Sequence, residues 1–442
     1  MAQEKVENHR IPLPPKTKLT ARLTIERLLS DCGGTSLTYI AKDDHNRTVV
    51  VKETYPLYTT VPLFRDGYRI VVEEESDAFK DELSETVAKF AEECHNADIL
   101  CSSGDTNSIF HFECRDITDE ALEDPEFHGS IARYMTIATV SGRTLGEIRE
   151  ADDISLKQAL LYTKKILYSL REMHSEPKRM LHLDLKDDNL FFPDQLSPEE
   201  TFAIILDSAG AQSIDHISAS ARFSISEGYA AKEIQLLKAY TETVINEAAA
   251  QKYRALIGVH TDLYSVGAIA YRLIMRDAFN PELWEEIQEE IREEKGEDAI
   301  NILANLHPST LVWEKIQEEY APNKKAKLIR AQVSTRLQAD YPYLVDRISD
   351  MLARALYFSA DEKELLQNRY TDCETFAADI DVILEILEQK GIHPEVVAAQ
   401  SRKQFEKILR NANVEFEGDP VANDHLFVQE WFPTVVEADD AY

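Results

Sequence analysis

The stretch LHLDLKDDNLFF, Leu181–Phe192, places a histidine, spaced aspartates, a lysine and an asparagine between apolar residues. It is too polar for a buried strand and too regularly patterned for an ordinary loop. An aspartate-rich turn that caps a helix is its simplest structural interpretation. The rest of the chain decides between that interpretation and a catalytic one.

Strands dominate the sequence before this loop. Three are predicted at residues 23–29, 37–42 and 48–53, separated by breaks that contain Gly, Asp and Asn. Short breaks of this kind favour antiparallel neighbours. Apolar residues then recur at helical spacing over 76–100, and another strand is expected within 132–140.

Helices dominate after Gly142. An amphipathic helix predicted at 156–174 leads directly into the loop, and a short buried strand is expected at 201–206. Further amphipathic helices are predicted at 281–298 and 372–390. The sequence therefore predicts an α+β protein whose strands and helices are largely separated along the chain.

The charge of the chain is strongly negative, with 80 acidic against 48 basic residues among 442 and a net charge of -32. Such a field repels phosphate backbones, so nucleic acid is not expected as a partner. The first ten residues lack the apolar segment of a secretory signal, and no apolar run approaches the ~20 residues that span a bilayer. We therefore expect a cytoplasmic protein with no membrane span.

The five cysteines form no CxxC pair, and their odd number argues against a disulfide framework. Four potential zinc ligands are close in the sequence: Cys94, Cys101, His111 and Cys114. Their spacings fit no compact zinc knuckle, and thiols are common in protein cores. A zinc ion is therefore only an alternative interpretation of these residues.

In this setting the loop resembles the catalytic loop of protein kinases, in which an Asp is followed by a Lys two residues later and an Asn five residues later. The matching residues are Asp184, Lys186 and Asn189, with His182 as the structural histidine of the loop. In that family the Asp orients the attacking hydroxyl and accepts its proton, the Lys steadies the transferred phosphoryl group, and the Asn holds a metal ion.

Three more motifs of the family occur in the expected order. TFAIILDSAGA resembles the segment that supplies the main Mg²⁺ ligand, which would be Asp207. VVVKETYP resembles the strand whose lysine grips the ATP phosphates, which would be Lys52, and its three valines predict a buried strand. The expected acidic partner of Lys52 is Glu93 in KFAEEC, in preference to Glu92 or Glu85.

The resemblance implies ATP and Mg²⁺ as cofactors. The residues that it assigns to nucleotide binding are Gly33, Gly34, Lys52, Ala138 and Val140. The glycine-rich turn departs from the family, because Asp31 and Ser36 stand at its outer positions, and an aspartate repels phosphate. DSA also replaces the DFG motif at 207–209, and Leu183 replaces the arginine before the catalytic Asp.

The second half carries three further resemblances: SEGYAAKEI to the end of an activation segment, HTDLYSVGAIAYRLI to the central helix, and NRYTDCETF to the late arginine motif. Glu233 and Arg369 are accordingly expected to form a buried ion pair. KETYP resembles the KEYFP style of bacterial Hanks-type serine/threonine kinases. In that class a hydroxyl residue, here Ser226, bridges the catalytic Asp and Lys.

The resemblance covers about residues 20–390. It implies a two-lobed protein-kinase-like fold with a small, antiparallel β-rich N-lobe containing one helix and a larger helical C-lobe. The predicted domains are an extension at 1–19, the N-lobe at 20–139, the C-lobe with insertions at 140–390 and an acidic tail at 391–442. Trp431 and Phe432 of the tail are predicted to dock on the kinase body.

Three functional hypotheses follow. The first is an active kinase that transfers the ATP γ-phosphoryl group to Ser or Thr of a protein substrate. The second is a pseudokinase that binds partners without turnover, which the altered glycine turn favours. The third is a small-molecule phosphotransferase, since such enzymes share the Asp-to-Asn spacing; Lys186 and the segment 226–233 argue against it.

Overall fold

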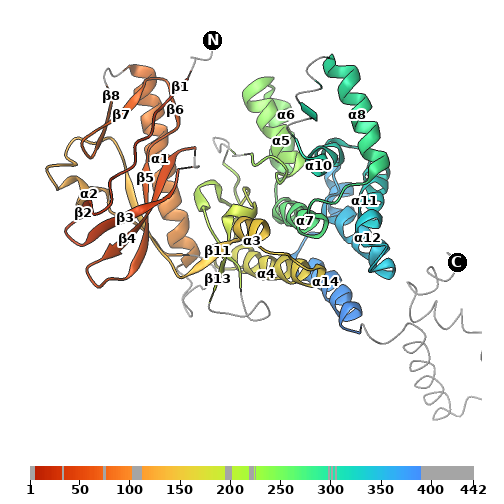
Figure 1. Ribbon diagram of the computed structural model, residues 1–442. Coiled ribbons are helices and arrows are strands. Elements are labelled where there is room, and N and C mark those ends of the chain that lie inside the picture. Colours follow the sequence, from red (N-terminus) through yellow and green to blue (C-terminus); the bar gives the residue numbers. More distant parts are fainter. Residues whose placement is uncertain are drawn as a thin grey trace, which may run out of the picture. The chain divides into compact units, whose positions relative to one another are not determined.

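The computed structural model describes residues 5–31, 34–72, 76–101, 112–194, 202–218, 223, 225–296, 299, 302–303 and 306–389 (Figure 1). Gly33 and the tail, with Trp431 and Phe432, lie outside the described residues. The chain divides into two compact units, 1–152 with 168–226 and 153–167 with 227–442. The loop at 181–192 thus belongs to the same unit as the predicted strands, whereas the predicted boundary after residue 139 separated them.

A six-stranded antiparallel sheet lies at the centre of the first unit (Figure 1). In spatial order its strands are β2 (Lys18–Thr20), β3 (Leu23–Ser30), β4 (Ser36–Asp43), β5 (Thr48–Thr54), β10 (Tyr134–Ala138) and β9 (Cys114–Asp116). The strands predicted at 23–29, 37–42, 48–53 and 132–140 are confirmed as β3, β4, β5 and β10. The proline-rich lead-in also contributes β2 to this sheet, which the sequence analysis did not predict.

One face of the sheet packs on the main hydrophobic core of the first unit. Val51 of β5 is fully buried there, beside Tyr39 of β4. Val50 and Lys52 alternate to the opposite face and are only half-buried, since successive strand residues point to opposite sides. The prediction of a buried strand from the run of valines is therefore wrong in part, because an antiparallel sheet with one packed face buries every second residue most deeply.

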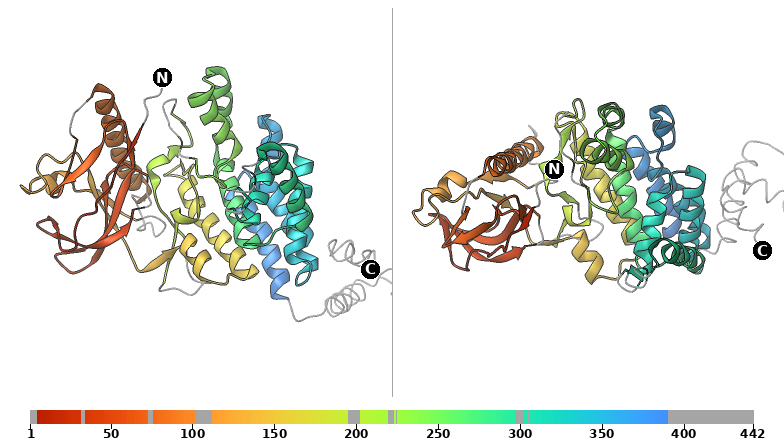
Figure 2. Two further views of the ribbon diagram at one scale, coloured as in Figure 1. Left: turned by 45° about the horizontal axis from the view of Figure 1, so that its top comes forward. Right: turned by 90° about the horizontal axis from the view of Figure 1, so that it is seen from above.

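Helix α1 (Asp77–Cys101) runs beside the strands of this unit, as Figures 1 and 2 show. Its buried positions Phe90, Glu93, Ala97 and Leu100 repeat every three to four residues, so they form one helical face. The helix confirms the prediction over 76–100. A second, short helix, α2 (Thr118–Leu122), was not predicted.

Short elements complete the first unit. The small antiparallel pairings are β1 (Val6–Glu7) with β6 (Tyr58–Thr59), β7 (Leu63–Asp66) with β8 (Arg69–Val72), β12 (Met180–Leu181) with β15 (Gln212–Ser213), and the three-stranded set β11 (Gly142–Thr144), β13 (Leu190–Pro193) and β14 (Ile204–Ile205). The short helices are α3 (Leu145–Ala151), η1 (Asp187–Asn189) and η2 (Ser208–Gly210). The predicted buried strand at 201–206 is thus confirmed only as the two residues of β14.

Every secondary-structure element in the described part of the second unit is a helix. Its helices are α5 (Lys232–Lys238), η3 (Ala239–Thr243), α6 (Glu247–Ala255), α7 (Val259–Met275), α8 (Pro281–Lys295), α10 (Pro308–Glu318), α11 (Pro322–Leu337), η5 (Pro342–Leu344), α12 (Val345–Ala355), α13 (Glu362–Asn368) and α14 (Cys373–Glu388). The division between the units falls within α4 (Leu156–His174). The helices predicted at 156–174, 281–298 and 372–390 are confirmed.

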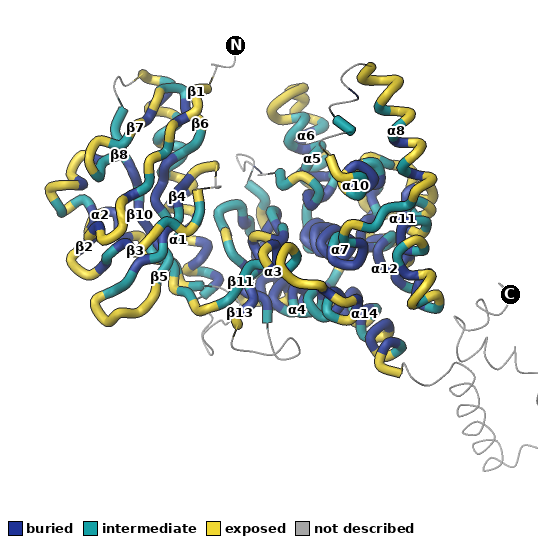
Figure 3. Tube along the Cα trace, in the orientation of Figure 1, coloured by how far each residue is buried: buried dark blue, intermediate teal, exposed yellow. Residues whose placement is uncertain are grey.

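Helix α7 is the central element of this second unit. It is buried on all sides, and Figure 3 shows it in dark blue along most of its length. A Cβ at Gly267 would lie 2.5 Å from Cβ of Ala355 in α12, so glycine allows these two helices to approach closely. The apolar helix and its close neighbours make the core of the second unit.

Candidate functional site

Hydrogen bonds within the loop at 181–192 fix its shape and join it to Leu206. His182 is fully buried, and its Nε2 lies 2.9 Å from the carbonyl oxygen of Leu206. The backbone N–H of Asp184 donates to His182 Nδ1 at 3.3 Å. Both contacts fit the tautomer that carries its proton on Nε2, so both ring nitrogens of His182 serve to hold the loop in shape.

Asn189 connects the other end of the loop to the same two residues, Asp184 and Leu206. Its side-chain Nδ2 donates to the carbonyl oxygen of Asp184 at 2.8 Å, and its own carbonyl oxygen accepts from the backbone N–H of Leu206 at 2.8 Å. Leu206 is therefore bonded to the loop through both of its backbone groups. Asp207 follows it directly, so these bonds hold the segment that carries Asp207 beside the loop.

Ser226 donates its hydroxyl to Oδ1 of Asp184 at 2.6 Å. This contact was predicted, together with a second one to Lys186. Among the described residues Ser226 makes no hydrogen bond to Lys186, so only half of the predicted bridge is present. Asp184 and Lys186 are both partly exposed, whereas the residues between and beside them are buried. The loop thus presents these two polar groups on its accessible side.

Lys52 lies between two carboxylates. Its Nζ donates to both oxygens of Glu93 in α1, at 2.7 and 2.8 Å, and lies 3.9 Å from Oδ1 of Asp207. The predicted pair of Lys52 and Glu93 is therefore present. Of the alternatives, Glu85 pairs with Lys89. The side chains of Lys52 and Glu93 are 17% and 9% exposed against 42% for Asp207, so Asp207 is the accessible acid of the three.

The pKa values of these groups follow from their packing. Burial by itself would lower the pKa of the Lys52 ammonium, but the charges of Glu93 and Asp207 outweigh it and raise that pKa. Burial raises the pKa of Glu93, which Lys52 offsets only in part. The ammonium of Lys52 lowers the pKa of Asp207 against the effect of burial. The accessible carboxylate is therefore ionised at neutral pH beside a charged lysine.

Asp207 and Asn189 offer oxygen donors of the kind that Mg²⁺ prefers. Asp207 adopts a left-handed backbone conformation, with φ of 58°, at the start of η2. The Nδ2 bond of Asn189 leaves its Oδ1 as the remaining side-chain acceptor. This donor set, an ionised carboxylate and an oriented amide oxygen, fits a magnesium ion.

Asn96 of α1 is a residue of this region that the sequence analysis missed. It is 4% exposed, and its Nδ2 donates to the carbonyl oxygens of Ser208 at 2.9 Å and Ala211 at 3.3 Å. DSA at 207–209 contains no phenylalanine, and this amide makes a polar connection between α1 and the segment after Asp207. Asn96 follows Glu93 by three residues on the buried helix face, and a polar residue at such a position was the available signal.

Helix α3 supports the loop from outside. Nε of Arg149 lies 2.8 Å from Oδ2 of Asp187, whose side chain is 3% exposed. A Cβ at Gly146 would lie 2.4 Å from Oδ1 of Asp188, so the absence of a side chain lets α3 approach the loop. Helix α3 therefore contacts the loop through the Arg149–Asp187 ion pair and through its close approach at Gly146.

The turn that the kinase resemblance assigns to nucleotide binding is anchored at its described ends by a second missed residue, Arg10. Its guanidinium donates to the carbonyl oxygens of Ser36 at 3.3 Å, Tyr55 at 3.2 Å and Asp31. The carbonyl oxygen of Gly34 also accepts from the N–H of Leu57 at 2.8 Å. Both ends of the turn are thus tied to the N-terminal segment and to the residues that follow β5.

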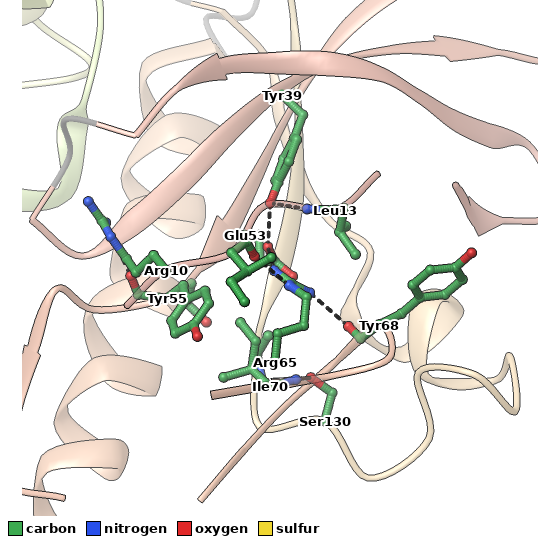
Figure 4. Close-up of polar contacts among 12 residues, drawn as sticks. Arg10, Leu13, Tyr39, Glu53, Tyr55, Arg65, Tyr68, Ile70 and Ser130 are labelled. Carbon is green, nitrogen blue, oxygen red and sulfur yellow. Dashed lines mark hydrogen bonds and ion pairs between the residues drawn. The ribbon is translucent and has the colours of Figure 1, made fainter. Parts of the chain in front are cut away.

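Figure 4 shows a polar network of the first unit that is centred on Glu53. Glu53 is fully buried and accepts from the hydroxyl of Tyr39 at 2.7 Å, the hydroxyl of Tyr134 at 3.1 Å and the guanidinium of Arg65 at 2.5 Å. Arg65 donates in turn to the carbonyl oxygen of Ile11 at 2.6 Å. The predicted extension at 1–19 is therefore bonded into the first unit over its described part.

The remaining nucleotide-binding candidates lie at the end of β10. Ala138 pairs with Val49 across the sheet, and its N–H donates to the carbonyl oxygen of Glu113 at 2.9 Å. Ala138 and Val140 are both exposed, Val140 by 45%. Among the described residues neither forms a hydrogen bond or an ion pair with Lys52. The structure thus brings the loop, Lys52, Glu93 and Asp207 together and leaves Ala138 and Val140 at an exposed strand end.

The predicted buried ion pair of the second unit is confirmed. Arg369 donates to the two carboxylate oxygens of Glu233 at 2.6 and 3.3 Å, and both side chains are fully buried. Burial alone would raise the pKa of Glu233, but Arg369 and His260 outweigh it and lower that pKa. Thr261 also donates to Glu233 at 3.0 Å. The pair joins α5 to the segment before α14 within the second unit.

The zinc alternative receives no support. Cys94, Cys101 and Cys114 form no group of potential metal ligands among the described residues, and His111 lies outside them. Burial raises the pKa of each of these three thiols, as expected for cysteines packed in a protein interior. Across the described residues, no helix has the length and apolar character needed to cross a membrane.

No protein family model matches this sequence, and no curated protein matches it either.

Proposed function

We propose that this chain is a serine/threonine protein kinase of the bacterial Hanks type, which transfers the ATP γ-phosphoryl group to a hydroxyl of a protein. The observation that carries the proposal is the position of Lys52, bonded to Glu93 and 3.9 Å from Asp207. A lysine held by a helix glutamate, beside an accessible aspartate, is what phosphate binding next to a metal requires. A structural ion pair alone would not need the third, exposed acid.

The loop supplies the other groups that the reaction needs. Asp184 is partly exposed and accepts a hydrogen bond from a serine hydroxyl, that of Ser226, at 2.6 Å. The same carboxylate would orient the hydroxyl of a substrate and accept its proton. Lys186 is partly exposed two residues later, where its charge would stabilise the transferred phosphoryl group.

Magnesium would be held by Asp207 and Asn189, and when bound it would neutralise negative charge on the ATP phosphates. The residues of the chain orient these donors without it. Both backbone groups of Leu206 are bonded to the loop, so the backbone that leads into Asp207 is tied to Asn189 and His182. This arrangement pre-positions the two ligands, which reduces the cost of ordering them when the metal binds.

The two-lobed kinase fold is part of the same proposal. An antiparallel sheet with a long helix beside it in the first unit, and a helical second unit with a buried Glu–Arg pair, support it. The departures at Asp31 and Ser36 favour the alternative of a pseudokinase that binds partners without turnover. Asp31 is exposed on the turn, where its charge would repel a triphosphate.

The test is phosphate incorporation measured by intact mass, with the full chain, Mg²⁺, ATP and a generic basic protein. Asp184→Asn and Asp207→Asn should abolish incorporation, because each removes a charge that the reaction uses. Asp188→Asn is the matched control, since Asp188 is an exposed aspartate of the same loop, and it should retain activity.

A wild-type chain that incorporates no phosphate would refute turnover. If Mg²⁺ and ATP also leave its melting temperature unchanged, the pseudokinase hypothesis takes its place. Phosphorylation of a small hydroxylated metabolite mixture but of no protein would instead favour the small-molecule phosphotransferase.

A further inference from the structure

The second unit contains a cavity of about 180 Å³ between the start of α11, the end of α12 and the segment before α13. This is below the usual volume of pockets that bind drug-sized molecules, so the cavity suits a smaller ligand. Its walls include the aromatic rings of Tyr320 and Phe358, whose centroids are 6.2 Å apart at an interplanar angle of 72°. The cavity shares no residue with the kinase site proposed above.

Lys325 lines this cavity and is only 5% exposed. Within the part of the chain that the structure describes, its ammonium makes no hydrogen bond and no ion pair. Removing most of a lysine side chain from water without giving its ammonium a partner is costly, so proteins seldom retain such a lysine without a ligand or a counter-ion. Burial, together with the positive charges of Arg369 and Lys232, lowers the pKa of Lys325 to about 8, although the charges of Glu319 and Glu233 act in the opposite direction.

The other charged groups of the cavity already have partners. Glu319 accepts from the N–H of Ala321 at 2.8 Å and pairs with Lys324 at 3.0 Å. Arg354 lies 3.5 Å from Asp379, and its guanidinium covers the ring of Tyr370. Lys325 is therefore the group of this cavity whose charge is left to be balanced.

We propose that the cavity binds a small organic anion, a carboxylate or a phosphate on an apolar or aromatic body, and that Lys325 forms the ion pair with it. The aromatic walls would cover the body of the ligand, and the ammonium would meet its charge. Tyr357, which also lines the cavity, accepts a hydrogen bond from Nε of Arg369 at 2.6 Å through its carbonyl oxygen. The bound anion would thus stabilise the part of the second unit that contains the Glu233–Arg369 pair.

The test is thermal unfolding of the full chain followed by tryptophan fluorescence, because Trp284 and Trp313 both belong to the second unit. Benzoate and phenyl phosphate are the probes, and benzamide is the uncharged control. One of the two anions should give a saturable rise in melting temperature that benzamide does not give. Which anion does so distinguishes a carboxylate site from a phosphate site.

Two variants separate the cavity from general salt effects. Lys325→Met keeps an apolar chain of similar length and should weaken anion binding by roughly 10- to 100-fold, the range expected for one buried charged hydrogen bond. Lys327→Met is the matched control, because Lys327 is an exposed lysine of the same helix, and it should bind like the wild type. Equal shifts in all three proteins, or no shift with either anion, would overturn the proposal.

Titration of Lys325 gives an independent readout. Reductive ¹³C-methylation places an NMR reporter on the amine, and the bound anion should raise the pKa of Lys325 above its value of about 8 in the free protein. An unchanged titration curve at anion concentrations that saturate the thermal shift would place the anion elsewhere and refute the role of Lys325.

Discussion

Replacing Lys325 by methionine should make the second unit more stable at neutral pH. The pKa of Lys325 falls from an ordinary value of 10.5 to about 8 in the folded protein. Since one pKa unit corresponds to ~1.4 kcal/mol, the charged, buried ammonium costs the folded state about 3 kcal/mol. Methionine removes that cost and keeps a flexible apolar chain in the cavity wall. The expected gain at pH 7 is therefore up to about 3 kcal/mol.

The pH dependence has a defined sign. The unfolded chain keeps the proton on Lys325 up to about pH 10.5, whereas the folded protein releases it near pH 8. Between these values the unfolded state binds more protons, so the wild-type free energy of unfolding rises with pH through this window. The destabilisation is complete below about pH 8. The advantage of Lys325→Met over wild type should accordingly shrink as the pH rises from 8 towards 10.

Urea unfolding at pH 7 and at pH 10, followed by tryptophan fluorescence, measures both effects. Lys327→Met should match the wild type at each pH, because its side chain is exposed. A Lys325→Met variant that is less stable than wild type at pH 7 would refute the reasoning, since it would mean that the ammonium has a stabilising partner. An advantage that is the same at both pH values would refute the titration of Lys325 as its cause.

Three other perturbations have defined outcomes. Glu233→Gln should lower the free energy of unfolding of the second unit by about 3–5 kcal/mol in the same urea assay, because it leaves the buried Arg369 charge without its partner. The double variant Glu233→Leu, Arg369→Met should lose much less unfolding free energy than the sum of the two single changes. Asn96→Leu should lower the free energy of unfolding by about 1–3 kcal/mol, since two carbonyl oxygens after Asp207 lose their buried donor. Amide hydrogen exchange should increase more in the η2 segment than in β3. Glu53→Gln should lower the free energy of unfolding of the first unit by about 3–5 kcal/mol, because it leaves the charge of Arg65 without its partner. Amide hydrogen exchange in β4 and β5 should become faster, and unchanged exchange rates there would contradict this prediction.

Much of the fold could be predicted because its long elements carry strong local patterns. The helices at 77–101, 156–174 and 373–388 each have a regular apolar face, and the strands β3 to β5 are separated by turn residues. The short pairings were not predicted. Strands of two to four residues contain too few side chains to show an alternation, so their formation depends on neighbours that are distant in sequence.

For the candidate site, the sequence could identify the charged residues that recur at the spacing of a known motif. It could not identify the residues whose hydrogen bonds hold those charged residues in position. Glu93 could be selected as the partner of Lys52 because KFAEEC resembles the end of the corresponding kinase helix, and Glu93 is a buried residue of α1. Arg10 and Asn96 act through hydrogen bonds to backbone carbonyls that are 21 to 115 residues away. A carbonyl is present at every residue, so no side-chain pattern marks the acceptor, and only the folded chain shows it.

The register of β5 links the fold to the candidate site. Val51 lies opposite Tyr39 in β4, which places Glu53 on the same face as Tyr39 and Lys52 on the other. A slip of one residue would exchange the faces, burying Lys52 among apolar side chains and exposing Glu53, which would lose three hydrogen bonds. Either displacement leaves a buried charge without its partner, at a cost of several kcal/mol. The hydrogen bonds of Glu53 therefore fix the register of β5 and keep Lys52 on the side that faces Glu93. A substitution that removes these hydrogen bonds should break the Lys52–Glu93 ion pair before the sheet unfolds.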